Sequence, residues 1–229
     1  MSELYLVRHG QASLGSDNYD QLSELGYRQS QALGNYVSER ELSFDFLLTG
    51  TLQRHLQTLD GIAANAQLHG VDRAEHAGLN EYDFHSLVAS YAKQHSQDPL
   101  VIAAKENPRD AKLFYRLLRQ VLTAWSRDAL AGGSETYSGF VQRIRGVAED
   151  IQRQADRGGR ILAVSSGGAI SQFVGVMLGL APEKVFELNL QARNTGITQF
   201  FFNEKKYNLL QFNGIAHLDH PDRRELISF

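Results

Sequence analysis

The sequence predicts an α/β protein with a mostly parallel, doubly wound sheet and helices on both of its faces. Short apolar, strand-like runs alternate along the chain with segments whose apolar residues recur at helical spacing. Three of these runs end abruptly in polar residues and glycine, as buried parallel strands do at their carboxyl ends. The 229 residues contain no internal repeat, low-complexity tract or flexible linker. We therefore expect three layers within a single domain, 1–229.

The first half of the chain is expected to supply three strands and two helices. The strands should lie at 4–7, 44–48 and 74–77, and the helices at 23–40 and 52–64. Ser23 is a suitable N-cap for the first helix, because its hydroxyl can accept a hydrogen bond from a backbone N–H of the first turn. Thr49-Gly50-Thr51 reads as a turn with capping residues before the second helix. This alternation of strand and helix indicates parallel neighbours in the sheet.

The second half begins with a long helical, amphipathic stretch. A helix is expected from Asp110 to Ala131, between Pro108 and the pair Gly132-Gly133. We expect 83–133 to form a helical insertion that caps the ligand-binding edge of the sheet. The remaining elements should be helices at 135–156 and 167–178 and strands at 160–164, 197–202 and 207–212.

Composition excludes several classes of function. The formal net charge is -3, from 23 Lys+Arg against 26 Asp+Glu, which gives no general reason to expect nucleic-acid binding. The absence of cysteine excludes disulfides, thiolate catalysis and cysteine-based zinc sites. No apolar run approaches the roughly 20 residues that span a bilayer, so no membrane association is expected. Because the chain begins directly with a strand-like segment, we expect a cytoplasmic protein.

Residues that could carry chemistry gather at three expected strand ends. Arg8-His9-Gly10-Gln11 follows the first strand, Arg54 and His55 come one turn into the helix after the second, and Ser165-Ser166-Gly167-Gly168 opens a later helix. Ligands of such sheets bind beyond the carboxyl ends of the strands. Arginine offers a rigid fork of donors suited to phosphate, and helix N-termini present unpaired N–H groups. A neutral imidazole can attack phosphorus.

Taken singly, each of these features is also typical of ordinary structure. Their joint arrangement along one sheet edge favours a site for a phosphoryl group. We expect the phosphate ligands to be Arg8, Gln11, Arg54, Ser166 and Gly167. The two arginines would supply the positive charge, and no aspartate cluster has metal-ligand spacing, so neither a metal nor a cofactor is expected. The expected partner is a small phosphorylated substrate or inorganic phosphate.

The strand followed by Arg8-His9-Gly10 resembles the signature of the histidine phosphatase (phosphoglycerate mutase-like) superfamily. The resemblance implies that His9 is the phosphoryl acceptor and that Arg8 and Arg54 clamp the phosphoryl oxygens. The segments that follow this signature in the family are matched by Leu22-Ser23, Leu25-Gly26, Leu52, Arg54 and Thr58.

The family's proton donor is a glutamate in a Leu-x-Glu segment, which Leu79-Asn80-Glu81 resembles. The resemblance implies that Glu81 protonates the leaving-group oxygen and later helps to activate water. Without these flanking residues, Glu81 would be interpreted as an exposed loop residue. The family's later segments are matched by Gly133, Glu135, Thr136, Phe140, Arg143, 194–198 and 213–218. The resemblance therefore covers nearly all of the chain, although the expected cap matches only in character.

One position departs from the family's pattern. Where the family has Ser-His-Gly-Gly, this chain has Ser165-Ser166-Gly167-Gly168. Serine can donate one hydrogen bond but carries no positive charge. Losing one preorganised donor costs roughly 10²–10³ in rate, so we expect slow turnover, a different substrate or no activity. His55, His85 and His217 are candidates to take over the missing role, although a surface or packing role is commoner for each.

Three functions remain open. The first is a metal-independent phosphomonoesterase in which His9 carries the phosphoryl group. The second is a catalytically weak, phospho-ligand-binding or regulatory protein, in which Ser166→His should raise activity. The third and least favoured is a phosphoglycerate mutase, because the Trp-Asn pair of the family's mutases is absent from 13–20 and the sole tryptophan is Trp125.

The expected cap and the last strands leave two further questions open. The aromatic residues of the cap could line an apolar pocket or belong to the core. An edge strand near Phe200–Phe202 could pair two copies in a homodimer, whereas a hairpin packed on the core would explain its phenylalanines equally well. The cap aromatics in question are Tyr82, Phe84, Tyr91, Phe114 and Tyr115.

Overall fold

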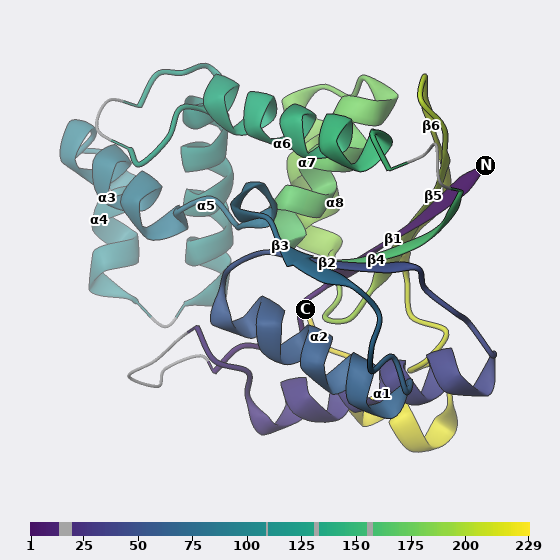
Figure 1. The fold of residues 1–229 in the computed structure, drawn as a ribbon. Helices are drawn as coiled ribbons and strands as arrows, with labels where there is room; N and C mark the ends of the chain where they lie inside the picture. Colours follow the sequence, from purple (N-terminus) through teal and green to yellow (C-terminus); the bar gives the residue numbers. More distant parts are fainter. Residues whose placement is uncertain (14–19, 109, 131–132, 155–157) are drawn as a thin grey trace.

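A computed structural model describes residues 1–13, 20–108, 110–130, 133–154 and 158–229. Its centre is a six-stranded sheet with the order β3-β2-β4-β1-β5-β6 (Figure 1). Strands β3, β2, β4 and β1 are parallel, whereas β5 runs antiparallel to both of its neighbours. The expected mostly parallel α/β sheet is therefore confirmed. The strands are β1 (Ser2–Arg8), β2 (Phe46–Thr49), β3 (Arg73–Glu75), β4 (Gly159–Ser165), β5 (Ile197–Phe202) and β6 (Tyr207–Gly214).

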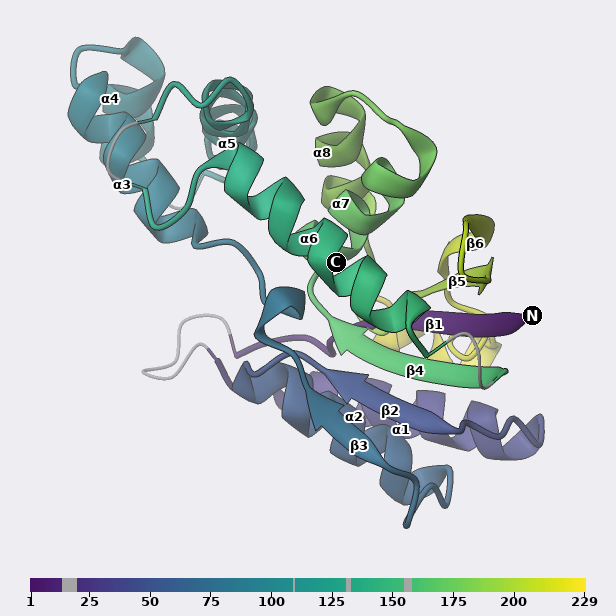
Figure 2. The ribbon, with the colours of Figure 1, turned by 45° about the horizontal axis from the view of Figure 1, so that its top comes forward.

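Helices cover both faces of the sheet. Figure 2 shows α1 and α2 below the sheet and α6 and α7 above it, with α8 packed against α7. Helices α3, α4 and α5 form a group at one end of the molecule, where α3 and α4 both pack on α5. The helices are α1 (Glu24–Glu39), α2 (Gln53–Asn65), α3 (Phe84–Gln94), α4 (Pro99–Glu106), α5 (Ala111–Ser126), α6 (Tyr137–Gln152), α7 (Gly167–Leu178) and α8 (Pro182–Gln191), with short 3-10 turns η1 (Ala77–Leu79) and η3 (Pro221–Leu226).

The alternation of side chains along the central strands divides the core into two layers. In β1, Leu4 and Leu6 are fully buried in the core shared with α6 and α7. Val7 faces the opposite core, which α1 and α2 complete. Ala163 and Val164 of β4 divide between the two layers in the same way. Strands buried on both faces must be apolar throughout, which explains the continuous apolar runs in the sequence.

Two sequence expectations about helices need correction. The long helix expected from Asp110 to Ala131 ends at Ser126 instead. Asp128 has a left-handed backbone, with φ 50°, and its carboxylate accepts a hydrogen bond from the backbone N–H of Tyr137, which ties the following loop to α6. Ala131 and Gly132 lie outside the described residues. Helix α8 was not expected from the sequence at all, although Pro182 at its first turn is a typical helix start.

The strand near Phe200–Phe202 is not an edge strand. β5 is hydrogen-bonded to β1 on one side and to β6 on the other, so β6 forms the edge. Phe200 and Phe202 are fully buried in the core layer of α6 and α7. The edge-strand interpretation was wrong, and the alternative of a hairpin packed on the core is confirmed. A homodimer stays a prediction without this strand to support it.

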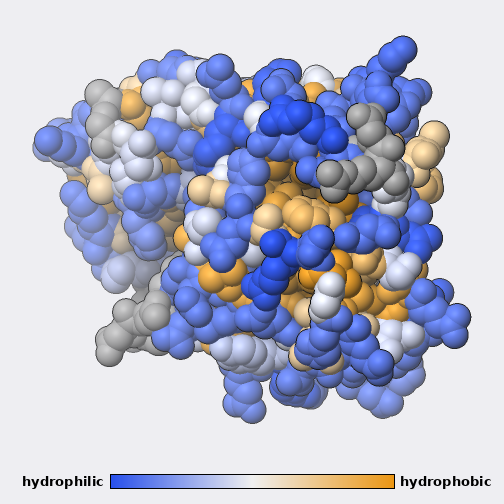
Figure 3. All heavy atoms as spheres, in the orientation of Figure 1, coloured by the Kyte–Doolittle hydropathy of each residue, from blue (hydrophilic) through white to orange (hydrophobic). Residues whose placement is uncertain are grey.

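Apolar side chains are also visible on one surface of the molecule. Figure 3 shows them gathered in the middle of this face, framed by polar residues. A cavity of about 160 Å³ lies between α6 and the strands β2, β3 and β4. Its apolar lining consists of Phe46, Leu48, Ala74, Ile151 and Ile161.

Candidate active site

The carboxyl ends of β1, β4 and β2 lie side by side and carry the candidate residues. β4 is the middle strand of the three, and its Ser165 is paired in register with Arg8 of β1. The backbone N–H of His9 donates to the carbonyl of Ser165 (2.9 Å), and that of Gly50 donates to the carbonyl of Val164 (3.0 Å). These bonds continue the pairing beyond the strands and bring the segments after β1 and β2 next to the start of α7.

The ring of His9 is buried and held in one tautomer. Its Nδ1 lies 2.6 Å from the carbonyl oxygen of Gly10. Because a carbonyl oxygen only accepts, Nδ1 carries the hydrogen and Nε2 holds the lone pair. Nε2 is 3.3 Å from Nε of Arg54. Burial lowers the pKa of His9 well below its usual value, and the neighbouring charge of Arg8 lowers it further. His9 therefore presents a neutral imidazole with a nucleophilic nitrogen.

The backbone beside His9 is fixed by α1 and α2. The hydroxyl of Thr58 accepts from the backbone N–H of Gly10 (3.0 Å) and donates to the carbonyl of Arg54 (2.7 Å). Gly10 also lies directly against α1, since a Cβ there would be 2.5 Å from the carbonyl oxygen of Gly26. Glycine at this position is what allows the loop after β1 to approach the N-terminus of α1.

Both expected phosphate-clamping arginines lie at this edge and are oriented by hydrogen bonds. Arg54 is buried in the first turn of α2, and its Nη1 donates to Oδ1 of Asp20 (2.6 Å). Oδ2 of Asp20 accepts from the backbone N–H of Gln53 (2.9 Å), so this carboxylate also satisfies the start of α2. The Nη1 of Arg8 donates to the carbonyl of Ala192. Sequence reasoning missed Asp20, which no local pattern singles out.

Glu81 reaches the same site from the segment before α3. Its Oε2 accepts from the backbone N–H of Gly168 (2.9 Å) and its Oε1 from that of Tyr82 (3.2 Å). A Cβ on Gly168 would lie 2.2 Å from Oε1, so the carboxylate fits only against glycine. Burial raises the pKa of Glu81, opposed by the hydrogen bond from Gly168. A raised pKa favours the protonated carboxyl that a general acid requires.

Two other expected phosphate ligands have defined neighbours. Gly167 is the first residue of α7, and a Cβ there would lie 3.4 Å from Nε of Arg8. Gln11 is tied to α1, because its Oε1 accepts from the hydroxyl of Ser23 (2.8 Å) and its backbone N–H donates to Oε1 of Gln29 (2.8 Å). The contacts of Gln11 explain how it anchors the loop to α1, and its part in phosphate binding stays a prediction.

Ser166 and His55 form a buried pair beside His9. Both residues are fully buried, and Nε2 of His55 lies 2.7 Å from Oγ of Ser166. The rings of His55 and His9 have their centroids 5.6 Å apart. Burial lowers the pKa of His55 to about 3, and the charge of Arg54 contributes to this shift. His55 is therefore neutral at physiological pH.

The other two candidate histidines contact different parts of the molecule. His85 is exposed on α3, with its ring against Phe84 at a centroid distance of 5.6 Å. His217 is buried, and its Nε2 lies 2.8 Å from the hydroxyl of Thr195. Thr195 in turn donates its backbone N–H to the carbonyl of Arg8 (3.0 Å), so His217 supports the backbone behind the site. Of the three histidines, His55 is the one placed against both Ser166 and His9.

A pocket of about 250 Å³ opens next to the charged residues. Arg8 and Glu81 form its inner wall, and its outer wall is mainly aromatic and apolar, with the amide of Asn189 among the lining side chains. The sequence left open whether five aromatic residues of the expected cap line a pocket or belong to the core; four of them line this pocket, and the fifth, Tyr91, does not. Phe229 also borders this pocket, and the guanidinium of Arg193 lies 5.6 Å from the centroid of the Phe229 ring. The aromatic residues of the wall are Tyr82, Phe84, Phe114, Tyr115 and Phe229.

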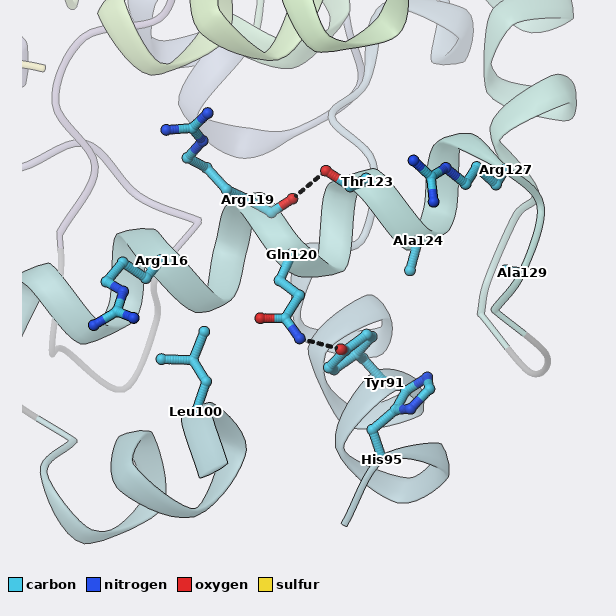
Figure 4. A pocket seen from close by; sticks show the side chains of 10 residues that line it. All are labelled: Tyr91, His95, Leu100, Arg116, Arg119, Gln120, Thr123, Ala124, Arg127 and Ala129. Atoms are coloured by element: carbon cyan, nitrogen blue, oxygen red, sulfur yellow. Dashed lines mark hydrogen bonds between the residues drawn. The ribbon is translucent and has the colours of Figure 1, made fainter. Parts of the chain in front are cut away.

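A larger cavity, of about 610 Å³, lies between α3, α4 and α5, away from the catalytic candidates. Figure 4 shows Gln120 pointing toward Tyr91, where its Nε2 donates to the Tyr91 hydroxyl (2.6 Å). Three arginines, two on α5 and one directly after its last residue, stand at the rim of this cavity and are exposed to solvent. Tyr91 thus belongs to the packing between helices. The three rim residues are Arg116, Arg119 and Arg127.

The chain belongs to the histidine phosphatase superfamily: residues 4–214 match the family model for its branch 1. A curated relative, the 2,3-bisphosphoglycerate-dependent phosphoglycerate mutase of Nitrobacter hamburgensis, is 26% identical over 199 residues, which are 83% of this chain and 88% of that protein. The enzyme of the same name from Hamiltonella defensa is 24% identical over 213 residues, 83% of each chain. Family membership supports phosphoryl transfer as the general class of reaction.

Solved structures share the fold at lower sequence identity. Phosphoserine phosphatase from Entamoeba histolytica, in complex with 3-phosphoglyceric acid, aligns with a TM-score of 0.65 and 21% identity, covering 95% of this chain and 100% of that one. Phosphoglycerate mutase from Bacillus anthracis aligns with a TM-score of 0.67 and 16% identity, and the alignment covers 94% of each chain. A putative alpha-ribazole-5'-P phosphatase from Escherichia coli aligns with a TM-score of 0.63 and 20% identity, and the alignment covers 93% of this chain and 96% of that one. These likenesses confirm the fold.

Among the residues that the structure describes, no group of three or more histidine, aspartate or glutamate side chains is arranged to hold a metal ion. No helix among them combines the length and apolarity needed to cross a membrane.

Proposed function

We propose that this protein hydrolyses a phosphomonoester through a phosphohistidine formed on His9. The observation that carries the proposal is the fixed tautomer of His9, with Nδ1 donating to the carbonyl of Gly10 and Nε2 facing Arg54. A histidine held in this way has its nucleophilic nitrogen beside a cationic group that can neutralise a phosphoryl oxygen. Membership of the histidine phosphatase superfamily supports the same reaction.

The residues divide the two half-reactions between them. In the first, the lone pair of His9 Nε2 forms a bond to phosphorus while the ester P–O bond breaks, and the carboxyl of Glu81 gives its proton to the departing oxygen. In the second, the Glu81 carboxylate takes a proton from water as the water oxygen attacks phosphorus. The P–N bond then breaks, which releases phosphate and returns His9. Arg8 and Arg54 stabilise the charge on the phosphoryl oxygens in both steps.

The pocket beside Arg8 and Glu81 supports a substrate with an apolar or aromatic leaving group. Its outer wall is formed by the side chains of Tyr82, Phe84 and Phe114 and by other apolar residues. Such a wall favours burial of carbon-rich surface at roughly 25 cal/mol per Å². A highly charged second phosphate would find no cationic partner among those three aromatic side chains.

The experiment compares hydrolysis of an aryl phosphate by wild type and His9→Ala in the presence of EDTA. We expect the wild type to turn over and His9→Ala to lose activity while retaining the fold. Rapid acid-free quenching with ³²P-labelled substrate should trap an acid-labile, base-stable phosphoprotein in the wild type only. Equal hydrolysis by both proteins would contradict the proposal.

A second candidate function is a phosphate-binding protein with little turnover. Serine at position 166 favours it, because a serine hydroxyl supplies one hydrogen bond and no charge. In that case neither the wild type nor His9→Ala hydrolyses the aryl phosphate, while the wild type binds phosphate or vanadate. Mutase activity is the third candidate, supported by the names of the curated relatives. Transfer of label from substrate to a second phosphoglycerate, rather than to water, would identify it.

A further inference from the structure

His55 and Ser166 are joined in a way that neither helix requires. Ser166 is the N-cap residue of α7, yet its side chain makes no capping hydrogen bond to that helix. Its hydroxyl lies instead 2.7 Å from Nε2 of His55. Both side chains are fully buried. A buried hydrogen bond between two polar side chains in place of the usual cap indicates a specific use for that hydroxyl.

The surroundings of His55 decide which atom donates in this bond. Nδ1 of His55 is buried and has no hydrogen-bond partner among the described residues. A neutral imidazole carries one N–H, and a buried donor without an acceptor is rarer and costlier than a buried acceptor without a donor. The hydrogen therefore belongs on Nε2, which donates to Oγ of Ser166. The hydrogen of the serine hydroxyl is then left to donate to a further acceptor.

The position of Ser166 indicates what that acceptor is. Ser165, the preceding residue, accepts the backbone N–H of His9 at 2.9 Å. Ser166 thus follows the strand that adjoins His9, and the ring of His55 approaches His9 to a centroid distance of 5.6 Å from the other side. A Cβ built on Gly167, the next residue, would lie 3.4 Å from Nε of Arg8, so Arg8 lies close to this turn. The serine hydroxyl lies among the groups that would surround a phosphoryl group on His9.

We propose that His55 and Ser166 act as a two-residue relay, in which His55 Nε2–H donates to Ser166 Oγ and the Ser166 hydroxyl donates to a phosphoryl oxygen. Ser166 is the catalytic residue of the pair, and His55 is a positioning residue that acts through it. The relay rests on the proposed phosphohistidine chemistry at His9. It gives this chain a fixed donor at the position where the sequence has serine, without requiring a charged side chain there.

The relay makes a prediction about Ser166→His, the substitution expected from sequence to raise activity. Because His55 already fills the space beside a fully buried serine, a second imidazole there should overpack the site. We expect Ser166→His to lower the unfolding midpoint and not to raise kcat. Combining it with His55→Ala, which removes the neighbouring ring, should restore the unfolding midpoint and bring kcat to at least the wild-type value. A rise in kcat from Ser166→His alone, with unchanged stability, would overturn the relay.

A double-mutant cycle tests the coupling directly. Ser166→Ala and His55→Leu should each lower kcat for an aryl phosphate by on the order of 10²-fold, with KM little changed. The double variant should lose about the same factor, since each change breaks the same relay. His55→Gln, whose amide N–H can occupy the place of Nε2–H, should retain most of the activity. Circular dichroism and urea unfolding serve as the control for folding.

Two outcomes would show that His55 merely packs the site, and either would overturn the relay. In the first, the losses in kcat multiply in the double variant. In the second, His55→Gln is as inactive as His55→Leu. Vanadate binding separates this failure from failure of the proposed function. If wild type hydrolyses nothing, the proposed function fails, and vanadate affinity alone then decides the relay. Equal and non-additive losses of affinity in the single and double variants would support it, and an unchanged affinity would overturn it.

Discussion

His9 is buried and Glu81 is partly buried at the same edge of the sheet, yet burial moves their pKa values in opposite directions. Burial disfavours whichever form is charged, so it lowers the pKa of the imidazole and raises that of the carboxyl. The free enzyme therefore tends to hold a neutral nucleophile and a protonated acid at the same pH. This is the combination that the first half-reaction requires.

The first prediction concerns the pH dependence of activity. Because the pKa of His9 lies well below its ordinary value, acidification to pH 6 should leave His9 neutral and active. Because the pKa of Glu81 is raised, activity should fall as pH increases through that raised value and the acid loses its proton. The measurement is kcat/KM from pH 5 to 9, corrected for the ionisation of the substrate.

Glu81→Gln is the matched control for this profile. It should flatten the alkaline limb and reduce the rate most for substrates with poor leaving groups, which depend on protonation. An acid limb centred near pH 6.5 would contradict the buried, neutral state of His9.

The second prediction concerns Asp20, whose carboxylate accepts a hydrogen bond from Arg54, the proposed phosphate ligand. In Asp20→Asn, the amide oxygen can still accept the N–H of Gln53, so the start of α2 remains satisfied while the negative charge is removed. A partly exposed ion pair contributes about 0.2–1 kcal/mol. We therefore expect inorganic phosphate to bind more tightly, by a factor of about 1.4 to 5, as measured by isothermal titration calorimetry.

Asp20→Ala is the comparison that separates charge from capping. It removes both the charge and the acceptor for Gln53, and should destabilise the protein by about 1 kcal/mol, which Asp20→Asn should not do. Weaker phosphate binding in Asp20→Asn would mean that Asp20 orients Arg54 for the ligand and does not compete with it.

At the scale of elements, the start of α7 decides whether Glu81, the proposed general acid, keeps its position in the site. The third prediction is that Gly168→Ala abolishes most activity with the fold retained. The new Cβ would lie 2.2 Å from Oε1 of Glu81 and 2.4 Å from Cε1 of Tyr82. Both side chains must move, and Glu81 loses its position against the helix N-terminus. The measurement is kcat with an aryl phosphate, beside a phosphate-binding titration.

Gly146 in α6 provides a matched glycine control. No atom lies within 4 Å of a Cβ built there, outside its own helix and chain neighbours. Gly146→Ala should therefore stabilise the protein by about 0.5–1 kcal/mol through its helix propensity, with activity unchanged. If Gly168→Ala left kcat at the wild-type level, the placement of Glu81 against α7 would be unnecessary for catalysis.

At the scale of the whole molecule, three buried neutral histidines make the fold sensitive to acid. Burial lowers the pKa of His9 and brings those of His55 and His217 to about 3, with the charges of Arg54 and Arg223 as further causes for the last two. Each histidine has a pKa of about 6.5 in the unfolded chain. Below that pH the unfolded state binds more protons than the native state, so stability falls as pH falls.

The fourth prediction follows from this proton balance. Below about pH 6.5, unfolding lets each of the three histidines take up a proton. The raised pKa of Glu81 acts in the opposite direction, because unfolding lets this carboxyl release its proton. Unfolding therefore takes up about two protons net. The free energy of unfolding should decline by up to about 3 kcal/mol per pH unit below pH 6. Urea unfolding at pH 7.5, 6.5 and 5.5 measures it.

His217→Gln is the control variant, because His217 lies behind the site and its amide replacement can keep the contact with Thr195. His217→Gln should reduce the number of protons taken up on unfolding by about one, and the free energy of unfolding should depend correspondingly less on pH. A stability that stays constant from pH 7.5 to 5.5 would mean that the buried histidines are accessible to protons in the native state.

The sequence by itself determined the kind of fold and which segments meet at one edge of the sheet. Apolar runs that end in Arg8-His9, Thr49-Gly50 and Ser165-Ser166 predict buried parallel strands, and parallel strands necessarily bring their carboxyl ends to one edge. These features depend on local spacing and on rules of strand connection.

Only the tertiary structure decided the contacts between distant segments. His55 and Ser166 are 111 residues apart, and they meet because β2 and β4 are neighbours in the sheet. Strand order also decided that β5 is an inner strand, and it brought the carboxylate of Asp20 to Arg54. A local pattern fixes which face a side chain takes on its own element. The partner across the interface depends on the order in which elements pack, which no single segment specifies.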